Sequence, residues 1–306
     1  MPIEKSAPEM DRIVGANQEI EELGSGYGGD QGPAEGPLWW KDDGGYLLFS
    51  DIHNNRRMKW AAGEGVTLFK EPTNRANGLT RDLQGRLIAC EHDARRITRT
   101  EHDGSTTVIA NSYKGRQLNR PNDVVVKSDG CIYFTDPWTM PWPQDQWDLE
   151  FSGVYRITPD LGRMTLLVND FVIPNGLAFN LDETVLYVND SRRGHIRAWD
   201  LLPTGALALG TGRIFADLRG DRPGVPDGMK VDVAGHVYCS GPAGLWVMEP
   251  DGTHIGTVPI PELATNCAFG GADYSTMLVT ARTSVYAVPL RTRGIVPPGA
   301  AQAQAH

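Results

Sequence analysis

The chain has 306 residues, with 29 lysines and arginines against 38 aspartates and glutamates and a formal net charge of −9. It contains no Lys/Arg-rich run, and no segment reaches the roughly 18 consecutive apolar residues that a membrane-spanning helix needs. We therefore expect no nucleic-acid partner and no membrane insertion. The 35 glycines and 21 prolines interrupt the backbone too often for long helices, which excludes helical bundles and coiled coils.

The first 23 residues lack the basic start and apolar stretch of a secretory signal, so we expect a cytoplasmic protein. The cysteines stand singly and show no CxxC spacing, which argues against a zinc site and against a disulfide framework. We expect them to be reduced and buried as small apolar residues. They are Cys90, Cys131, Cys239 and Cys267.

In chain order, we expect an N-terminal extension over 1–18, one domain over 19–290 and a flexible tail over 291–306. The domain begins with a single strand, EIEELGSG, at 19–26. Six repeats follow, and each opens with a small-polar start. The starts are Glu35-Gly36-Pro37, Asn77-Gly78-Leu79, Asn122-Asp123-Val124, Asn175-Gly176-Leu177, Asp227-Gly228-Met229 and Asn266-Cys267-Ala268.

Each start leads to a second strand that ends in a polar or small residue, and a third strand of alternating polar and apolar residues comes next. The second strands are YLLFSD, RLIACE, CIYFTD, VLYVND, HVYCSG and TMLVTA. Successive starts lie 42, 45, 53, 52 and 39 residues apart, a period typical of four-stranded propeller blades.

The last repeat ends near residue 290, too early for a fourth strand, whereas the strand at 19–26 has no repeat of its own. We therefore predict an all-β, six-bladed β-propeller in which this N-terminal strand completes the final blade. Closure of the ring removes the exposed sheet edges that invite aggregation.

The innermost strands of a propeller line its channel, so the first residues of the starts should form one ring of polar side chains. Turn preference alone explains any single Asn or Asp there, but Glu is a poor turn residue, and two carboxylates facing each other across a channel repel. Oxygen-only donors favour Ca²⁺, then Mg²⁺ or Mn²⁺, with Zn²⁺ also possible. Spacing alone does not say which of the six would bind an ion. They are Glu35, Asn77, Asn122, Asn175, Asp227 and Asn266.

The chain resembles the senescence-marker-protein/gluconolactonase/luciferin-regenerating-enzyme family from about residue 20 to residue 290. The motifs that carry the resemblance are GPAEGPLW, LNRPNDVVVKSDGCIYFTDP, PNGLAF, LYVNDS and PDGMKVD. The resemblance implies one divalent cation in the channel, held by Glu35, Asn175 and Asp227 with Asn122 nearby. It also implies hydrolysis of a small sugar lactone.

The resemblance favours Asp227 as the general base for water, with a pure ligand role as the alternative. Arg120 could bind a substrate hydroxyl or carboxylate, or simply face solvent. Asn77 and Asn266 would orient water or substrate, or satisfy turns. Asn122 is expected to contact substrate as well as metal.

Further candidates lie where second strands end. Asp51, Glu91, Asp136 and Asp190 could line the channel, hold a second cation or accept turn hydrogen bonds. We favour a site role for Asp136 and Asp190, with Asp136 as a substrate contact. His92 and His53 follow the same strand ends and could also touch substrate. Trp138, Trp142 and Trp147 form either an aromatic wall over the channel or packing between blades.

Competing catalytic motifs are missing from the sequence: it contains no GxSxG, HExxH or GxxxxGK[ST]. Three readings remain, namely a metal-dependent sugar lactonase, a phosphotriesterase-like hydrolase using the same cation, and a non-catalytic propeller. An intact Glu/Asn/Asn/Asp set argues against the non-catalytic propeller, and the lactonase is the function that we favour. The sequence leaves the lactone, the physiological metal and the oligomeric state open.

Overall fold

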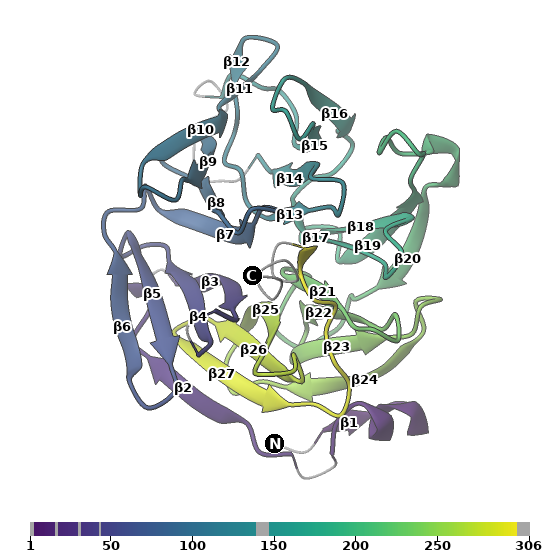
Figure 1. The fold of residues 1–306 in the computed structure, drawn as a ribbon. Helices are drawn as coiled ribbons and strands as arrows, with labels where there is room; N and C mark the ends of the chain where they lie inside the picture. Colours follow the sequence, from purple (N-terminus) through teal and green to yellow (C-terminus); the bar gives the residue numbers. More distant parts are fainter. Residues whose placement is uncertain (1–2, 16–17, 30–31, 43, 139–146, 299–306) are drawn as a thin grey trace.

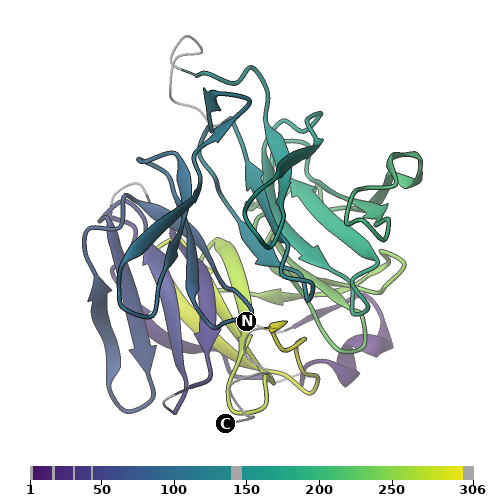
Figure 2. The same ribbon diagram turned by 45° about the horizontal axis from the view of Figure 1, so that its top comes forward.

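The computed structural model describes residues 3–15, 18–29, 32–42, 44–138 and 147–298. Six antiparallel sheets surround one central axis, and each presents its first strand to the centre (Figure 1). The turned view in Figure 2 shows the same sheets arranged around that axis. The fold is therefore an all-β, six-bladed propeller, as the sequence predicts.

Each of the first five blades is a four-stranded meander. Blade one holds β3 (Ala34–Trp40), β4 (Tyr46–Asp51), β5 (Arg56–Ala61) and β6 (Gly65–Lys70); blade two holds β7 (Ala76–Arg81), β8 (Leu87–Glu91), β9 (Arg96–Thr100) and β10 (Thr106–Ala110). A short hairpin of β11 (Ser112–Tyr113) and β12 (Arg116–Gln117) follows. Blade three holds β13 (Val124–Val126), β14 (Ile132–Asp136), β15 (Gly153–Ile157) and β16 (Met164–Val168).

The second half of the ring repeats this order. Blade four holds β17 (Pro174–Phe179), β18 (Val185–Asp190), β19 (His195–Asp200) and β20 (Arg213–Asp217); blade five holds β21 (Met229–Val231), β22 (Val237–Gly241), β23 (Gly244–Met248) and β24 (His254–Pro259). Blade six holds β25 (Ala264–Gly270), β26 (Thr276–Ala281) and β27 (Ser284–Pro289).

The N-terminal strand β2 (Glu21–Ser25) is the outer strand of blade six. It pairs antiparallel with β27, with Glu21 opposite Ala287 and Ser25 opposite Ser284 (Figure 1). The first and last parts of the domain thus share one sheet, which confirms the predicted closure of the ring.

Residues ahead of β2 pack on the rim. β1 (Glu4–Lys5) pairs with β24 and makes blade five a five-stranded sheet. The short 3₁₀ helix η1 (Pro8–Arg12) follows, and Met10, Ile13 and Val14 are fully buried. Burial of these apolar side chains stabilises the extension against the propeller.

The segment after β27 differs from the flexible tail that the sequence suggested. Its backbone amides bond to the body: Arg291 N donates to Ile13 O at 2.8 Å, and Ile295 N donates to Val231 O at 3.3 Å. Residues Ile295–Pro298 line a cavity of about 470 Å³ where the innermost strands end. Residues 299–306 lie outside the described part of the chain.

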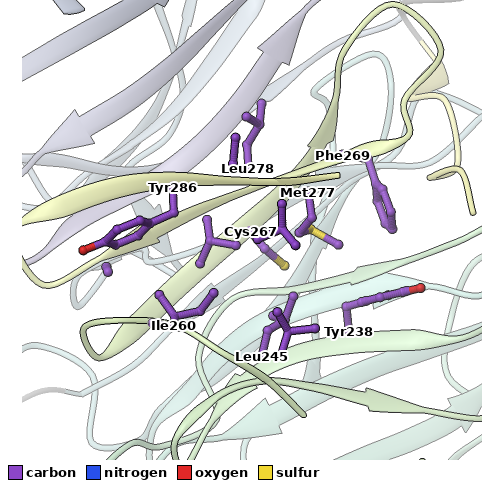
Figure 3. Close-up of a cluster of buried hydrophobic side chains, with 14 of the residues drawn as sticks. Tyr238, Leu245, Ile260, Cys267, Phe269, Met277, Leu278 and Tyr286 are labelled. Carbon is purple, nitrogen blue, oxygen red and sulfur yellow. The ribbon is translucent and has the colours of Figure 1, made fainter. Parts of the chain in front are cut away.

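Between the blades, the inward-facing apolar side chains form the core. Figure 3 shows part of this core, in which Tyr238 and Leu245 of blade five face Cys267 and Met277 of blade six, while Leu278 points to the other side of that sheet. All four cysteines are free and buried, as expected. None of the helices in the described residues is long and apolar enough to cross a membrane.

Candidate metal and substrate site

The predicted ring forms where the innermost strands begin. Asn77 Nδ2 donates to Asn122 Oδ1 at 2.6 Å, so the ring residues of blades two and three are hydrogen-bonded to each other. Asn266 Nδ2 donates to Glu35 Oε2 at 3.0 Å across the junction of blades six and one. Asn175 hydrogen-bonds Asp227, and the charges of Asp227 and Glu35 act on each other. Repeats distant in sequence therefore converge on one point.

Glycines after the ring residues let neighbouring blades approach. A Cβ on Gly36 would lie 2.1 Å from Asn77 O, and one on Gly176 would lie 2.1 Å from Asp227 O. Gly36 also has φ of +54°, which favours glycine. In the four starts that have a glycine, this residue is therefore required by close contact with the next blade, which keeps the polar ring narrow.

Polar residues near the ends of the second strands join each blade to the next. Ser50 Oγ donates to Asn77 O at 2.7 Å, and Thr135 Oγ1 donates to Asn175 O at 2.8 Å. Asn189 Nδ2 donates in the same way to Asp227 O. These bonds hold the backbone of ring residues in place and explain why the second strands end in polar residues.

The two ring carboxylates lie in an environment that disfavours their charge. Glu35 is 3% exposed, whereas Asp227 keeps partial exposure. Burial raises the pKa of both groups, and the Glu35 charge raises the pKa of Asp227 further. Two buried like charges are costly unless a cation or a proton neutralises them.

The donor set fits a hard divalent cation. The ring offers carboxylate oxygens from Glu35 and Asp227 and amide oxygens from Asn122 and Asn175, which are the oxygen ligands that Ca²⁺ accepts. The described residues form no cluster of three or more His, Cys, Asp or Glu side chains that could hold a metal. An ion in the ring would therefore take amide oxygens as well as carboxylates.

Sequence reasoning missed two charged neighbours of the ring. Asp123 is 4% exposed, and burial raises its pKa, while the Lys230 charge and a hydrogen bond from Asn266 oppose that shift. The Lys230 charge also acts on Glu35. The signal for Asp123 was present in the repeats, because it occupies the position that is glycine in four of the six starts.

Arg120 and two histidines form a group beside the ring. Arg120 Nη2 lies 3.3 Å from His92 Nδ1, and His92 Nε2 is buried without a partner among the described residues. Burial, helped by the charge of Arg120 and by His53, lowers the pKa of His92 to about 3, so this imidazole is neutral at pH 7. Burial also lowers the pKa of His53, and the charges of Arg75 and Arg120 add to the shift. Substrate contact by Arg120 and His92 remains a prediction.

The carboxylates at the ends of the second strands hold loops. Asp136 is fully buried, and its Oδ2 accepts from Asn119 N at 2.8 Å. Asp190 accepts from four backbone amides, and Asp51 accepts from Gly28 N at 2.7 Å. These contacts match the turn-acceptor alternative. Asp136 Oδ1 is buried without a hydrogen bond among the described residues, so substrate contact by Asp136 stays a prediction.

The tryptophans of the predicted aromatic wall are only partly described. Trp138 is half-buried, and its backbone amide donates to Ser152 Oγ at 2.8 Å. The guanidinium of Arg95 lies 5.5 Å from the ring centroid of Trp147. Trp142 lies outside the described residues. Contact between Trp138 and substrate therefore stays a prediction.

Fold and site together define a six-bladed propeller with a carboxylate and amide ring in its channel. The family described as "SMP-30/Gluconolactonase/LRE-like region" matches residues 33–283, so the chain belongs to this family. That result confirms the resemblance inferred from the motifs.

Three relatives illustrate the likeness. A gluconolactonase of Zymomonas mobilis is 32% identical, over 95% of this chain and 87% of its own. A pentonolactonase of Haloferax volcanii is 29% identical, over 80% of each chain. The solved structure of a gluconolactonase from Xanthomonas campestris superposes with a TM-score of 0.85 at 32% identity and covers 95% of each chain.

Proposed function

We propose that this chain is a metal-dependent lactonase of the gluconolactonase type, which hydrolyses a sugar lactone to the aldonic acid. The observation that carries the proposal is the pair Glu35 and Asp227, two enclosed carboxylates that share one ring with amide oxygens. Two relatives that match most of the chain are a gluconolactonase and a pentonolactonase, and this supports the choice of substrate class.

Glu35, Asn122, Asn175 and Asp227 would hold the ion, with Ca²⁺ the expected metal and Zn²⁺, Mn²⁺ or Mg²⁺ as alternatives. When bound, a divalent cation supplies Lewis-acid polarisation of the lactone carbonyl and stabilises the negative charge that develops on its oxygen. Enclosure of the ring by close backbone contacts keeps the ligand set rigid.

Asp227 is the proposed general base because it is the ring carboxylate that keeps partial exposure. It would accept a proton from the attacking water as the water oxygen bonds to the carbonyl carbon. It would then return that proton to the ring oxygen as the C–O bond breaks, which balances the reaction. Arg120 and neutral His92 would bind substrate hydroxyls beside it.

The test is proton release from glucono-1,5-lactone, corrected for spontaneous hydrolysis, with chelator-treated protein titrated with Ca²⁺. We expect a rate near zero without metal and saturation near one ion per chain. A protein that binds one ion but leaves gluconolactone and pentonolactones intact would overturn the lactonase proposal and leave the metal site standing. An active protein that is indifferent to chelation would overturn the metal site.

The Asp227→Asn variant tests the base itself. Loss of a general base costs about 100-fold or more in rate, and the amide keeps one oxygen ligand, so calcium binding should weaken without vanishing. Asp221→Asn is the matched control, because Asp221 is exposed. A variant that retains more than about a tenth of the wild-type rate would remove the base role from Asp227.

A further inference from the structure

One position of the repeat holds a different type of residue in blade one than in the other five blades. The second residue of the third strand pairs with the penultimate residue of the second strand in every blade. In five blades it is a buried aliphatic residue, at 0–1% exposure, and in blade one it is Arg57, at 3%. The five are Ile97, Val154, Ile196, Leu245 and Val285.

Among the residues that the structure describes, none hydrogen-bonds to or forms an ion pair with Arg57. Its Nε is buried without a hydrogen bond, and no hydrogen bond or ion pair joins its guanidinium to another described residue. Burial lowers its pKa to about 10, with the Glu91 charge opposing the shift. Arg81, at 4% exposure, shows the usual solution, because it pairs with Asp42 at 2.8 Å and stacks on Trp40. A buried and unpaired guanidinium is costly.

The nearest carboxylate is already occupied. Glu91 Oε2 accepts from Arg96 Nε at 2.7 Å and from Asn74 Nδ2 at 2.8 Å, while its Oε1 accepts from Thr98 Oγ1 at 2.9 Å. Glu91 therefore acts on Arg57 only through space. The donors of Arg57 remain available to a ligand.

Arg57 lines a cavity of about 130 Å³ between blades one and two, which adjoin in Figure 1. Lys70, directly opposite Arg57 across the β5–β6 pair, shares this cavity, and like charges in that position repel. Arg96 and the threonines of β9 and β10 add further donors to the lining. Three cations face one carboxylate there, so the cavity carries a positive excess.

We propose that this cavity is a binding site for a small oxyanion of the phosphate type. The guanidinium fork and hydroxyl donors match the several acceptor oxygens of phosphate, and the ammonium of Lys70 adds charge at the exposed rim. A bound oxyanion pairs the buried guanidinium and relieves its repulsion with Lys70. The site is separate from the channel ring and does not depend on the proposed lactonase activity.

The residue type that the other blades carry at this position suggests the variant that tests the proposed oxyanion site. Arg57→Leu installs the residue type that the other blades carry, so it should fold, and it removes the guanidinium. We expect calorimetric titration with inorganic phosphate to give one site per chain in the wild type. Binding should weaken at least about tenfold in Arg57→Leu, because a bidentate charged contact is lost. Lys70→Gln should weaken it less, since Lys70 is exposed.

Controls separate this site from others. Arg116→Leu, an equal charge change at an exposed arginine, should bind phosphate as the wild type does. Binding that survives Asp227→Asn is not binding in the channel. Methyl phosphate in place of inorganic phosphate distinguishes a phosphate ester from the free ion, and acetate tests whether a carboxylate suffices.

No phosphate binding by the wild type, or equal binding by Arg57→Leu, would overturn the proposal. If Arg57→Leu does not fold, Lys70→Gln and Thr98→Val decide the question, and wild-type affinity in both would overturn it.

Discussion

Removal of the Asp190 carboxylate should destabilise the protein and loosen one side of the ring. Its Oδ2 accepts from Val172 N at 2.8 Å, and its Oδ1 accepts from Ile173 N, Arg192 N and Arg193 N at 3.0–3.2 Å. Each of these partly exposed bonds contributes on the order of 1 kcal/mol, so Asp190→Ala should cost about 4 kcal/mol. Asp190→Asn should cost about 2 kcal/mol, because one amide would meet the new NH₂ group.

The loop held by Asp190 also reaches the proposed metal ligands. Ser191 follows it and accepts from Asn175 Nδ2 at 3.0 Å, while Ser191 Oγ donates to Pro226 O at 2.6 Å. Urea unfolding and calcium titration on the same variants would measure both effects. We expect a graded loss, wild type above Asn above Ala, with calcium affinity falling in the same order. Unchanged unfolding midpoints in both variants would refute the loop-anchor reasoning.

Two further predictions concern packing and pH. Gly228→Ala should abolish calcium binding or folding, because its Cβ would lie 1.9 Å from Asn266 Cγ; Gly210→Ala, with open space around it, is the control for urea unfolding and should match the wild type. The hydrogen bond to Asp232 raises the pKa of His236, so this pair stabilises the fold fully below the unfolded histidine pKa of about 6.5 and loses its effect as pH rises through the folded value. The difference in unfolding midpoint between wild type and His236→Gln should therefore be larger near pH 6 than near pH 9, and an equal difference at both values would contradict the assignment.

The repeat made the fold and the ring predictable. Six starts with a shared signature place Glu35, Asn122, Asn175 and Asp227 at one level of six equivalent strands, and in the structure their blades meet as that pattern requires. Closure of the ring by β2 was predictable because the last repeat lacks a fourth strand and the strand at the start of the domain belongs to no repeat. Such inferences need only the local period and the chemistry of sheet edges.

Contacts between unlike segments were not predictable in this way. The amide of Ile295 reaches Val231 across the far end of the channel, and the period says nothing about a segment that follows the last blade. Asp136 could not be separated from a substrate ligand by sequence, because a strand-end carboxylate has the same spacing whether it faces the channel or a loop amide. The structure adds the hydrogen bond from Asn119 N to Asp136 Oδ2, which the sequence pattern does not contain.

Two charged residues stand at repeat positions where most other blades have glycine or an aliphatic residue. Asp123 stands where four other blades have glycine and adds a third enclosed carboxylate to Glu35 and Asp227, while Lys230 contributes one positive charge. Ionisation of all three would leave two negative charges in this group, and the raised pKa values of these carboxyls reflect the cost of that state without a counter-charge. Arg57 departs in the opposite sense, placing an unpaired positive charge where five blades are aliphatic. In both places a stable propeller would be easier to build with the consensus residue, so the exceptional charge is best explained by a ligand of opposite sign.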